Sequence, residues 1–132
     1  MQNEVGSKKF TIDEIMNLIE KWLVSDELNA NILSEKFQFT SPVWKRANKM
    51  EFLAQFADPK SYKEVALSKI TQFDPIQLKN SDNKHFAIIL QYHTKNLCKV
   101  YETVFGIVED GLLVELRSIY DLDETKKVLE IR

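Results

Sequence analysis

The chain has 132 residues, of which 44% are hydrophobic and 29% charged, and its formal net charge is -2. This length fits one domain with a core of its own, and the composition excludes an extended, disordered chain. A near-neutral charge argues against a protein built mainly to hold nucleic acid, because that task needs a concentrated basic surface. We expect residues 1–9 to form a flexible segment and residues 10–132 to form a single domain.

Cysteine and histidine content and the lack of long apolar runs limit the expected partners. The single cysteine, Cys98, cannot form an internal disulfide, which favours a cytoplasmic location. No apolar run approaches the ~20 residues that a membrane-spanning helix needs, so no membrane partner is expected. His85 and His93 would lie roughly 26 Å apart on one strand and cannot share a metal. We therefore expect no metal site and no cofactor.

The first half of the chain carries the signals of helices. Thr11 and Glu14 have the spacing of a capping box, in which each side chain bonds a backbone N–H of the first turn. Apolar residues then recur at helical spacing and predict a helix that ends near Ser25. A second helix is predicted over residues 27–36. The apolar stripe of the first helix comprises Ile12, Ile15, Met16, Ile19, Trp22 and Leu23.

A short strand and a third helix are expected next. The alternation Phe-Gln-Phe-Thr at residues 37–40 predicts the strand. Asn48 and Glu51 stand at the N-cap and N3 positions of the helix, which Asp58 and Pro59 would end.

From about residue 65 the apolar residues recur with the period of strands. The first of these strands is expected to contain one bulge, because its apolar residues change parity. Asp110 and Gly111 predict a tight turn between the last two strands, since both tolerate positive φ. Helices that precede a run of strands are typical of an α+β fold with an antiparallel sheet. The predicted strands span residues 65–73, 85–94, 99–108 and 112–121.

Both faces of the predicted sheet carry apolar side chains. Thr103 and Phe105 share one face, whereas Val104 and Val108 share the other. A sheet with one solvated face would carry polar side chains on it. Because little chain is left to cover the second face, we expect a homodimer that forms through the sheet face.

Two stretches of the sequence resemble families with one common fold. Residues 37–43 read Phe-Gln-Phe-Thr-Ser-Pro-Val and precede the third helix, and residues 109–113 read Glu-Asp-Gly-Leu-Leu. With Ser-Ile-Tyr-Asp at residues 118–121, these resemble the SnoaL-like polyketide cyclases and the ketosteroid isomerases. The resemblance implies the α+β, cone-shaped, cystatin-like fold of nuclear transport factor 2. In that fold, helices pack in a bent antiparallel sheet, and the conical cavity holds a small, apolar or steroid-like molecule.

The resemblance also allows the functional positions of the ketosteroid isomerases to be compared with the residues of this chain. Ser41 stands where the ketosteroid isomerases have their general base, and a serine hydroxyl cannot act as a base at neutral pH. The oxyanion-hole tyrosine position falls near Leu18, and the position of the acid falls at Thr103 or Glu102. Isomerase activity of this type is therefore not expected.

A SnoaL-like reaction would use other residues. The resemblance implies Asp121 as a general base, and His93 could be its acid–base partner because imidazole titrates near neutrality. The alternatives are that Asp121 caps or pairs locally and that His93 lies at the surface or in a sheet interface. Trp44, in the loop after the short strand, could line a ligand site or close the open end of the cone. The candidate ligand-binding residues are Trp44, Phe56, Tyr92, Thr103, Ser118 and Tyr120.

Three functions are consistent with these patterns. The first is the binding of a small, largely apolar molecule in a conical cavity. The second is a cofactor-independent lyase, cyclase or isomerase that uses Asp121 as its acid–base group. The third is a protein-interaction or dimerisation module.

Overall fold

The computed structural model describes residues 9–25, 27–42, 46–54, 70–94, 99–121 and 123–124. Several predictions lie outside these residues: most of the flexible segment 1–9, the end of the third helix at Asp58 and Pro59, and residues 65–69. No described helix has the length and apolar character that crossing a membrane requires. The elements are α1 Ile12–Ser25, the 3-10 helix η1 Ala30–Ile32, β1 Leu33–Thr40, β2 Ala47–Asn48, α2 Lys49–Ala54, β3 Ile70–Lys79, β4 His85–Thr94, β5 Lys99–Glu109 and β6 Leu112–Ile119.

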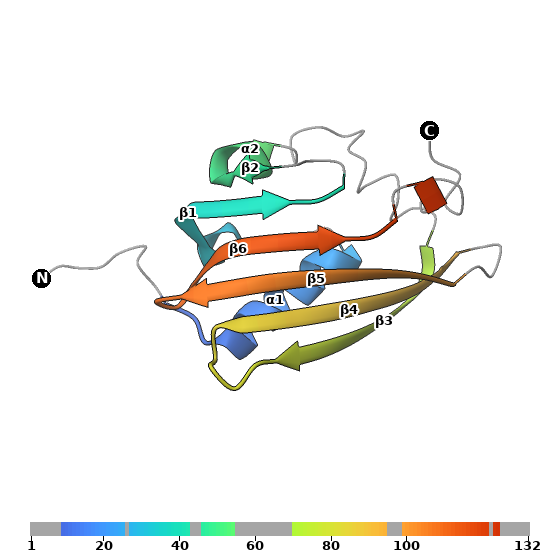
Figure 1. Ribbon diagram of the computed structural model, residues 1–132, viewed down its shortest axis with the longest axis horizontal. Helices are drawn as coiled ribbons and strands as arrows, with labels where there is room; N and C mark the ends of the chain where they lie inside the picture. Colours follow the sequence, from blue (N-terminus) through green and yellow to red (C-terminus); the bar gives the residue numbers. More distant parts are fainter. Residues whose placement is uncertain are drawn as a thin grey trace, which may run out of the picture.

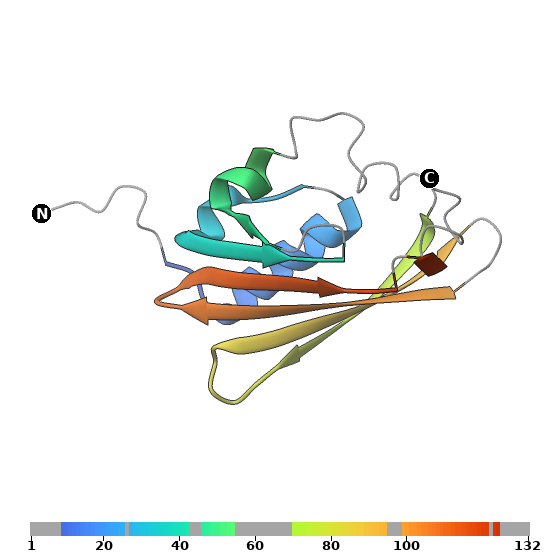
Figure 2. The same ribbon diagram turned by 45° about the horizontal axis from the view of Figure 1, so that its top comes forward.

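The described strands form one six-stranded sheet in the order β2-β1-β6-β5-β4-β3. In Figure 1 the helix α1 lies behind this sheet, and Figure 2 shows β3 and β4 turned away from β1 and β6 by the twist of the sheet. The α+β class is confirmed. Neighbouring strands are antiparallel except β1 and β6, which pair in parallel, so the sheet is mixed rather than wholly antiparallel as predicted.

The capping box predicted for the first helix is present. The backbone N–H of Thr11 donates to Glu14 Oε1 at 2.8 Å, and the N–H of Glu14 donates to Thr11 Oγ1 at 3.1 Å. These two bonds satisfy backbone groups that the first turn leaves without partners. All six residues of the predicted apolar stripe are buried: Ile12, Ile15, Met16, Ile19, Trp22 and Leu23.

The helix predicted over residues 27–36 is wrong. Asn29 Oδ1 accepts the N–H of Asn31 at 3.0 Å and caps only a short 3-10 turn, after which β1 begins at Leu33. The register between β1 and β6 shifts between Leu33 and Gln38, and this irregularity masks the alternation typical of a strand. Pairing with β6 and burial against the core therefore override a helix-like spacing of apolar residues.

The third predicted helix begins where expected. Asn48 N–H donates to Glu51 Oε1 and Glu51 N–H donates to Asn48 Oδ1, both at 2.8 Å. This reciprocal pair fixes the first turn of α2 directly after the two-residue strand β2. The cap sets the orientation of this turn, and Phe52, which follows Glu51, points into the core and is fully buried.

The two described turns of the strand region have local causes. Asp110 and Gly111 have φ values of 53° and 75°, as the predicted tight turn requires. In the turn before β4, Asp82 Oδ1 accepts the N–H of Lys84 at 2.8 Å and that of His85 at 3.1 Å. These backbone bonds hold the pKa of Asp82 well below its usual value.

The two faces of the sheet differ in what covers them. The inner face lies against α1, and Gln77 Nε2 on β3 donates to Asn17 Oδ1 and Glu20 Oε1 of that helix, both at 2.9 Å. No described helix covers the outer face, which is turned to the reader in Figure 1. Five large apolar side chains on this face are between 42% and 56% exposed: Ile76, Leu78, Tyr101, Phe105 and Ile119.

Candidate functional site

The strand register brings a small set of polar side chains to the inner face. Leu90 on β4 pairs with Glu102 on β5, and Val104 on β5 pairs with Ser118 on β6. Paired residues of antiparallel strands point to the same face, and so do alternate residues of one strand. Because Leu90 and Val104 are core residues, Tyr92, Glu102 and Ser118 point inward with them.

Glu102 and Ser118 form a hydrogen-bonded pair on this inner face. The hydroxyl of Ser118 donates to Glu102 Oε2 from the neighbouring strand. Ser118 is buried and Glu102 is half-buried, so the carboxylate is partly withdrawn from water. A polar group in such surroundings costs free energy unless it is hydrogen-bonded. The pair is therefore a distinct polar point beside the apolar core residues Leu90 and Val104.

Tyr92 and Thr94 extend the inner face toward the end of β4. Both are buried, and the ring of Tyr92 lies 6.3 Å from the ring of Phe73 on β3, centroid to centroid. Thr94 Oγ1 is buried and makes no hydrogen bond with a residue that the structure describes. This part of the surface combines aromatic area with hydroxyl groups, as ligand-binding surfaces do.

The predicted ligand-binding residues separate into three groups. Tyr92 and Ser118 lie together on the inner face, and Tyr120 is half-buried just after β6. Thr103 pairs with Ile119 on the outer face, so the sheet separates it from Ser118. Trp44 and Phe56 lie outside the described residues.

The two predicted catalytic residues are not brought together. Asp121 is exposed, and its Oδ1 accepts the N–H of Glu124 at 3.0 Å, as a local cap does. His93 lies on the outer side of β4, opposite Gln72 of β3 and separated from β6 by β5. Its Nδ1 is buried and bonds to no described residue.

Comparisons with known proteins agree on the architecture. An NTF2-like protein of unknown function from Cytophaga hutchinsonii superposes with a TM-score of 0.58 at 13% identity, covering 89% of this chain and 96% of that one. A candidate polyketide cyclase from Pseudomonas putida KT2440 gives 0.60 at 17% identity, covering 93% and 99%. A protein of ketosteroid isomerase-like fold from Catenulispora acidiphila, in complex with trimethylamine, gives 0.55 at 9% identity, covering 87% and 93%. No protein-family model and no curated protein matches the sequence.

The chain has the NTF2-like fold. Sequence identities this low establish the fold alone, and a fold of this kind serves different functions. The chemistry of this chain therefore depends on its own side chains.

Glu102 is the inner-face residue that sequence reasoning left out of the candidate site. Its position was considered only as one of two places for an isomerase-type acid, with Thr103 as the other. The signal was available in the alternation of β5, because Val104 is a core residue and Glu102 shares its parity. Glu102 is thus an inward-facing carboxylate, whereas Asp121 is exposed.

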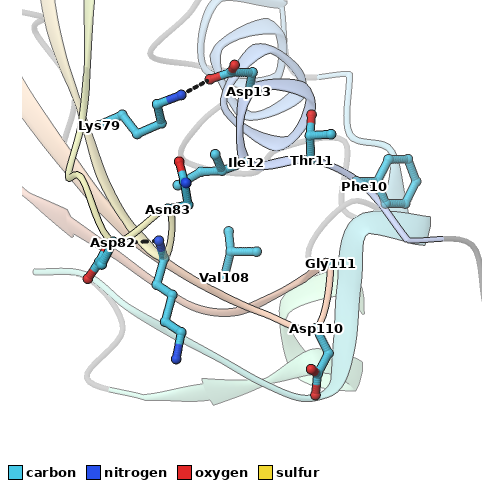
Figure 3. Close-up of a pocket in the computed structure, with 11 residues that line it drawn as sticks. Phe10, Thr11, Ile12, Asp13, Lys79, Asp82, Asn83, Val108, Asp110 and Gly111 are labelled. Carbon is cyan, nitrogen blue, oxygen red and sulfur yellow. Dashed lines mark hydrogen bonds and ion pairs between the residues drawn. The ribbon is translucent and has the colours of Figure 1, made fainter.

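A hollow lies at the other end of the sheet, away from Tyr92, Thr94 and the Glu102–Ser118 pair. Figure 3 shows this pocket of about 480 Å³ between the start of α1 and the two turns that contain Asp82 and Gly111. Lys79 Nζ and Asp13 Oδ1 form an ion pair across its rim at 3.1 Å. None of the predicted site residues lines it. Within the described part of the chain, no three His, Cys, Asp or Glu side chains form a group that could hold a metal ion.

Proposed function

We propose that the protein binds a small, largely apolar molecule against the inner face of its sheet, with Glu102 and Ser118 as the polar anchor. The observation that carries this proposal is the hydrogen-bonded pair of Glu102 and Ser118 beside the apolar core residues Leu90 and Val104. Ser118 donates its hydroxyl proton to the carboxylate, and the oxygens of both groups are hydrogen-bond acceptors. A ligand group that donates a hydrogen bond would fit this anchor.

The chemistry of ligand sites supports this proposal. Such sites are mostly apolar and fix the orientation of the ligand with a few placed polar groups. The inner face offers the ring of Tyr92 beside the Glu102–Ser118 pair. The Catenulispora acidiphila neighbour is a complex with trimethylamine, which supports small-molecule binding by proteins of this fold.

A cofactor-independent lyase, cyclase or isomerase with Asp121 as acid–base group is the second candidate. A general base must lie within hydrogen-bonding reach of the proton that it removes. The carboxylate of Asp121 is exposed and engaged with the N–H of Glu124, which favours binding over this reaction. Ser41 stands where the ketosteroid isomerases have their general base, and its hydroxyl cannot take the place of Asp121 as a base.

We further propose that the protein is a cytoplasmic homodimer that forms through its outer sheet face. The apolar side chains on this face are about half exposed in the single chain. Contiguous exposed apolar surface on a soluble protein usually marks an interaction site. The cytoplasmic location rests on the single cysteine, as argued from the sequence.

The ligand proposal can be tested by native mass spectrometry of protein purified gently from the cells that make it. We expect a small-molecule adduct on the wild-type chain, and a lower adduct fraction for Glu102→Gln and Ser118→Ala. Loss of one hydrogen bond in a desolvated site costs about 1–3 kcal/mol, which corresponds to roughly 5- to 150-fold in affinity. Thr103→Ala is the matched control, because it removes a hydroxyl from the opposite face of the sheet.

Two results would contradict the ligand proposal. One is an adduct that survives both inner-face substitutions but is lost from the Thr103→Ala protein. The other is a wild-type chain recovered without an adduct but bound to a different protein, which would favour the interaction-module function. Circular dichroism of each variant verifies that the fold is retained.

A further inference from the structure

The pocket beside the start of α1 is enclosed by three segments that backbone hydrogen bonds hold together. Phe10 N–H donates to Gly111 O at 2.9 Å, which fixes the chain before α1 against the turn between β5 and β6. Val108 N–H donates to Lys84 O at 2.7 Å and joins β5 to the turn before β4. The volume of the pocket, about 480 Å³, lies in the range of about 300–1,000 Å³ that is usual for small-molecule sites, which are largely preformed.

One side of this pocket is apolar and consists of Phe10, Ile12 and Val108. Phe10 and Ile12 flank the cap residue Thr11 of α1, and Val108 lies near the end of β5 (Figure 3). All three side chains belong to the hydrophobic core, and only 5–8% of their surface is exposed, so the core holds them in place. This side of the pocket favours a ligand that carries an aliphatic or aromatic group.

Three of the five charged residues that line the pocket already have partners in the protein. Lys79 Nζ lies 3.1 Å from Asp13 Oδ1, and Figure 3 shows this ion pair between β3 and the first turn of α1. Asp82 Oδ1 accepts two backbone N–H groups of its own turn, and Asp82 Oδ2 lies 2.6 Å from His85 Nδ1. These three side chains therefore stabilise the walls of the pocket.

The other two charged lining residues are Lys84 and Asp110. Both are exposed, and neither side chain forms an ion pair or a hydrogen bond with a residue that the structure describes. They lie on neighbouring turns, because Lys84 O accepts the N–H of Val108 and Asp110 follows Val108 by two residues. One positive and one negative side chain therefore stand beside the same pocket without forming an ion pair with each other.

We propose that this pocket binds a zwitterion, namely a free α-amino acid with an apolar side chain. The carboxylate of the amino acid accepts hydrogen bonds from Lys84 Nζ, and its ammonium group donates to the carboxylate of Asp110. Its side chain lies against Phe10, Ile12 and Val108. Each charged group of the ligand then forms a charge-assisted hydrogen bond, which is the stronger kind. This site is separate from the Glu102–Ser118 pair and does not depend on the ligand proposed there.

Ligands with a single charge fit this lining less well. A simple anion would meet Lys84 but would also lie near three carboxylates, those of Asp13, Asp82 and Asp110. A simple cation would meet Asp110 but would lie near the ammonium groups of Lys79 and Lys84. Like charges in one site oppose binding, whereas a ligand with both charges satisfies both unpaired side chains.

Three ligands with the same branched side chain test the proposal. L-leucine carries both charges, isoamylamine lacks the carboxylate, and 4-methylpentanoate lacks the ammonium group. In an amide NMR titration at neutral pH, L-leucine should cause saturable shifts of the Asn83, Val108 and Gly111 signals, with a dissociation constant of about 1 mM or tighter. Each analogue should bind at least about tenfold more weakly, because it leaves one charged side chain without a partner.

Two substitutions locate the site. Lys84→Gln and Asp110→Asn each remove one charge, and asparagine tolerates the φ of 53° at position 110. Each variant should bind L-leucine about five- to tenfold more weakly than the wild type. Lys21→Gln and Glu27→Gln are the matched controls, because they remove the same kinds of charge from an exposed ion pair at the other end of α1. Both controls should bind L-leucine like the wild type.

Two kinds of result would overturn the proposal. Binding of isoamylamine or 4-methylpentanoate as tight as that of L-leucine would show that the pocket recognises a single charge. Pocket signals that do not move at about 20 mM L-leucine, or an affinity that neither Lys84→Gln nor Asp110→Asn lowers, would show that no amino acid binds between these side chains. Neither result bears on the inner-face ligand, whose test uses Glu102→Gln and Ser118→Ala.

Discussion

Replacing Phe52 by alanine is expected to lower the free energy of unfolding by about 3–5 kcal/mol. Phe52 is fully buried at the start of α2, and its ring lies 5.5 Å from Trp22, 5.1 Å from Phe37 and 4.8 Å from Phe39. Removing the ring leaves a cavity between α1 and the inner face that the neighbouring rings cannot fill without leaving their preferred rotamers. Urea denaturation followed by fluorescence measures the change.

Met50→Ala provides the matched control for this prediction. Met50 lies on the same short helix but is 80% exposed, so its truncation should change the free energy of unfolding by less than about 0.5 kcal/mol. If both variants unfold at the same urea concentration, the aromatic cluster does not hold α2 against the sheet. Alanine has a higher helix propensity than either Phe or Met, so a loss of stability reports the loss of buried contacts.

Replacing Gly106 by alanine is expected to destabilise the fold by about 1–3 kcal/mol or more. Gly106 on β5 pairs with Phe86 on β4, and a Cβ atom at Gly106 would overlap the Phe86 ring. Phe86 is buried, and its backbone is held in the centre of the sheet. Its ring can therefore avoid a Cβ atom at position 106 only by adopting a strained rotamer. The ring therefore occupies the space that a side chain at Gly106 would take.

A double-mutant cycle with Phe86→Leu tests this explanation. The smaller side chain frees the space above Gly106, so Gly106→Ala should cost less in the Phe86→Leu background than in the wild type. An interaction energy of about 0.5–3 kcal/mol is expected for residues in direct contact. An equal cost in both backgrounds would show that the ring is not what excludes a side chain from position 106.

Local signals in the sequence were sufficient to predict the caps and the last turn. The pairs Thr11–Glu14 and Asn48–Glu51 bond across a single helical turn, and Asp110 and Gly111 adopt positive φ side by side. Each of these features depends on residues within four positions of one another, so no tertiary contact can overrule it easily.

Features that depend on pairing between distant segments could not be predicted in this way. Residues 27–36 have apolar residues at a spacing that suits a helix, but β6 provides backbone partners for a strand from Leu33 onward. The parallel pairing of β1 with β6 also joins segments about 80 residues apart in sequence, as Leu33 and Leu113 show. The spacing of apolar residues along the chain does not indicate which distant segments pair with each other.

The candidate site could be predicted only in part, because it too depends on contacts between distant segments. Alternation identified Tyr92 and Ser118 as possible inward residues, but which face was inner depended on the position of α1. Thr103 was therefore placed in the same set as Ser118 although the sheet separates them. Asp121 follows the last residue of β6, where alternation no longer determines the direction of a side chain.

Methyl-resolved NMR spectroscopy tests most directly whether the two faces of the sheet serve different partners. Dilution of the protein should shift the methyl signals of Ile76, Ile89 and Ile119 on the outer face, because it would separate the two copies of the proposed homodimer. Addition of the lipid-soluble extract of the producing cells should instead shift the signals of the inner-face residues Ile88, Leu90 and Val104. Shifts confined to the outer face under both conditions would contradict the assignment of ligand binding to the inner face.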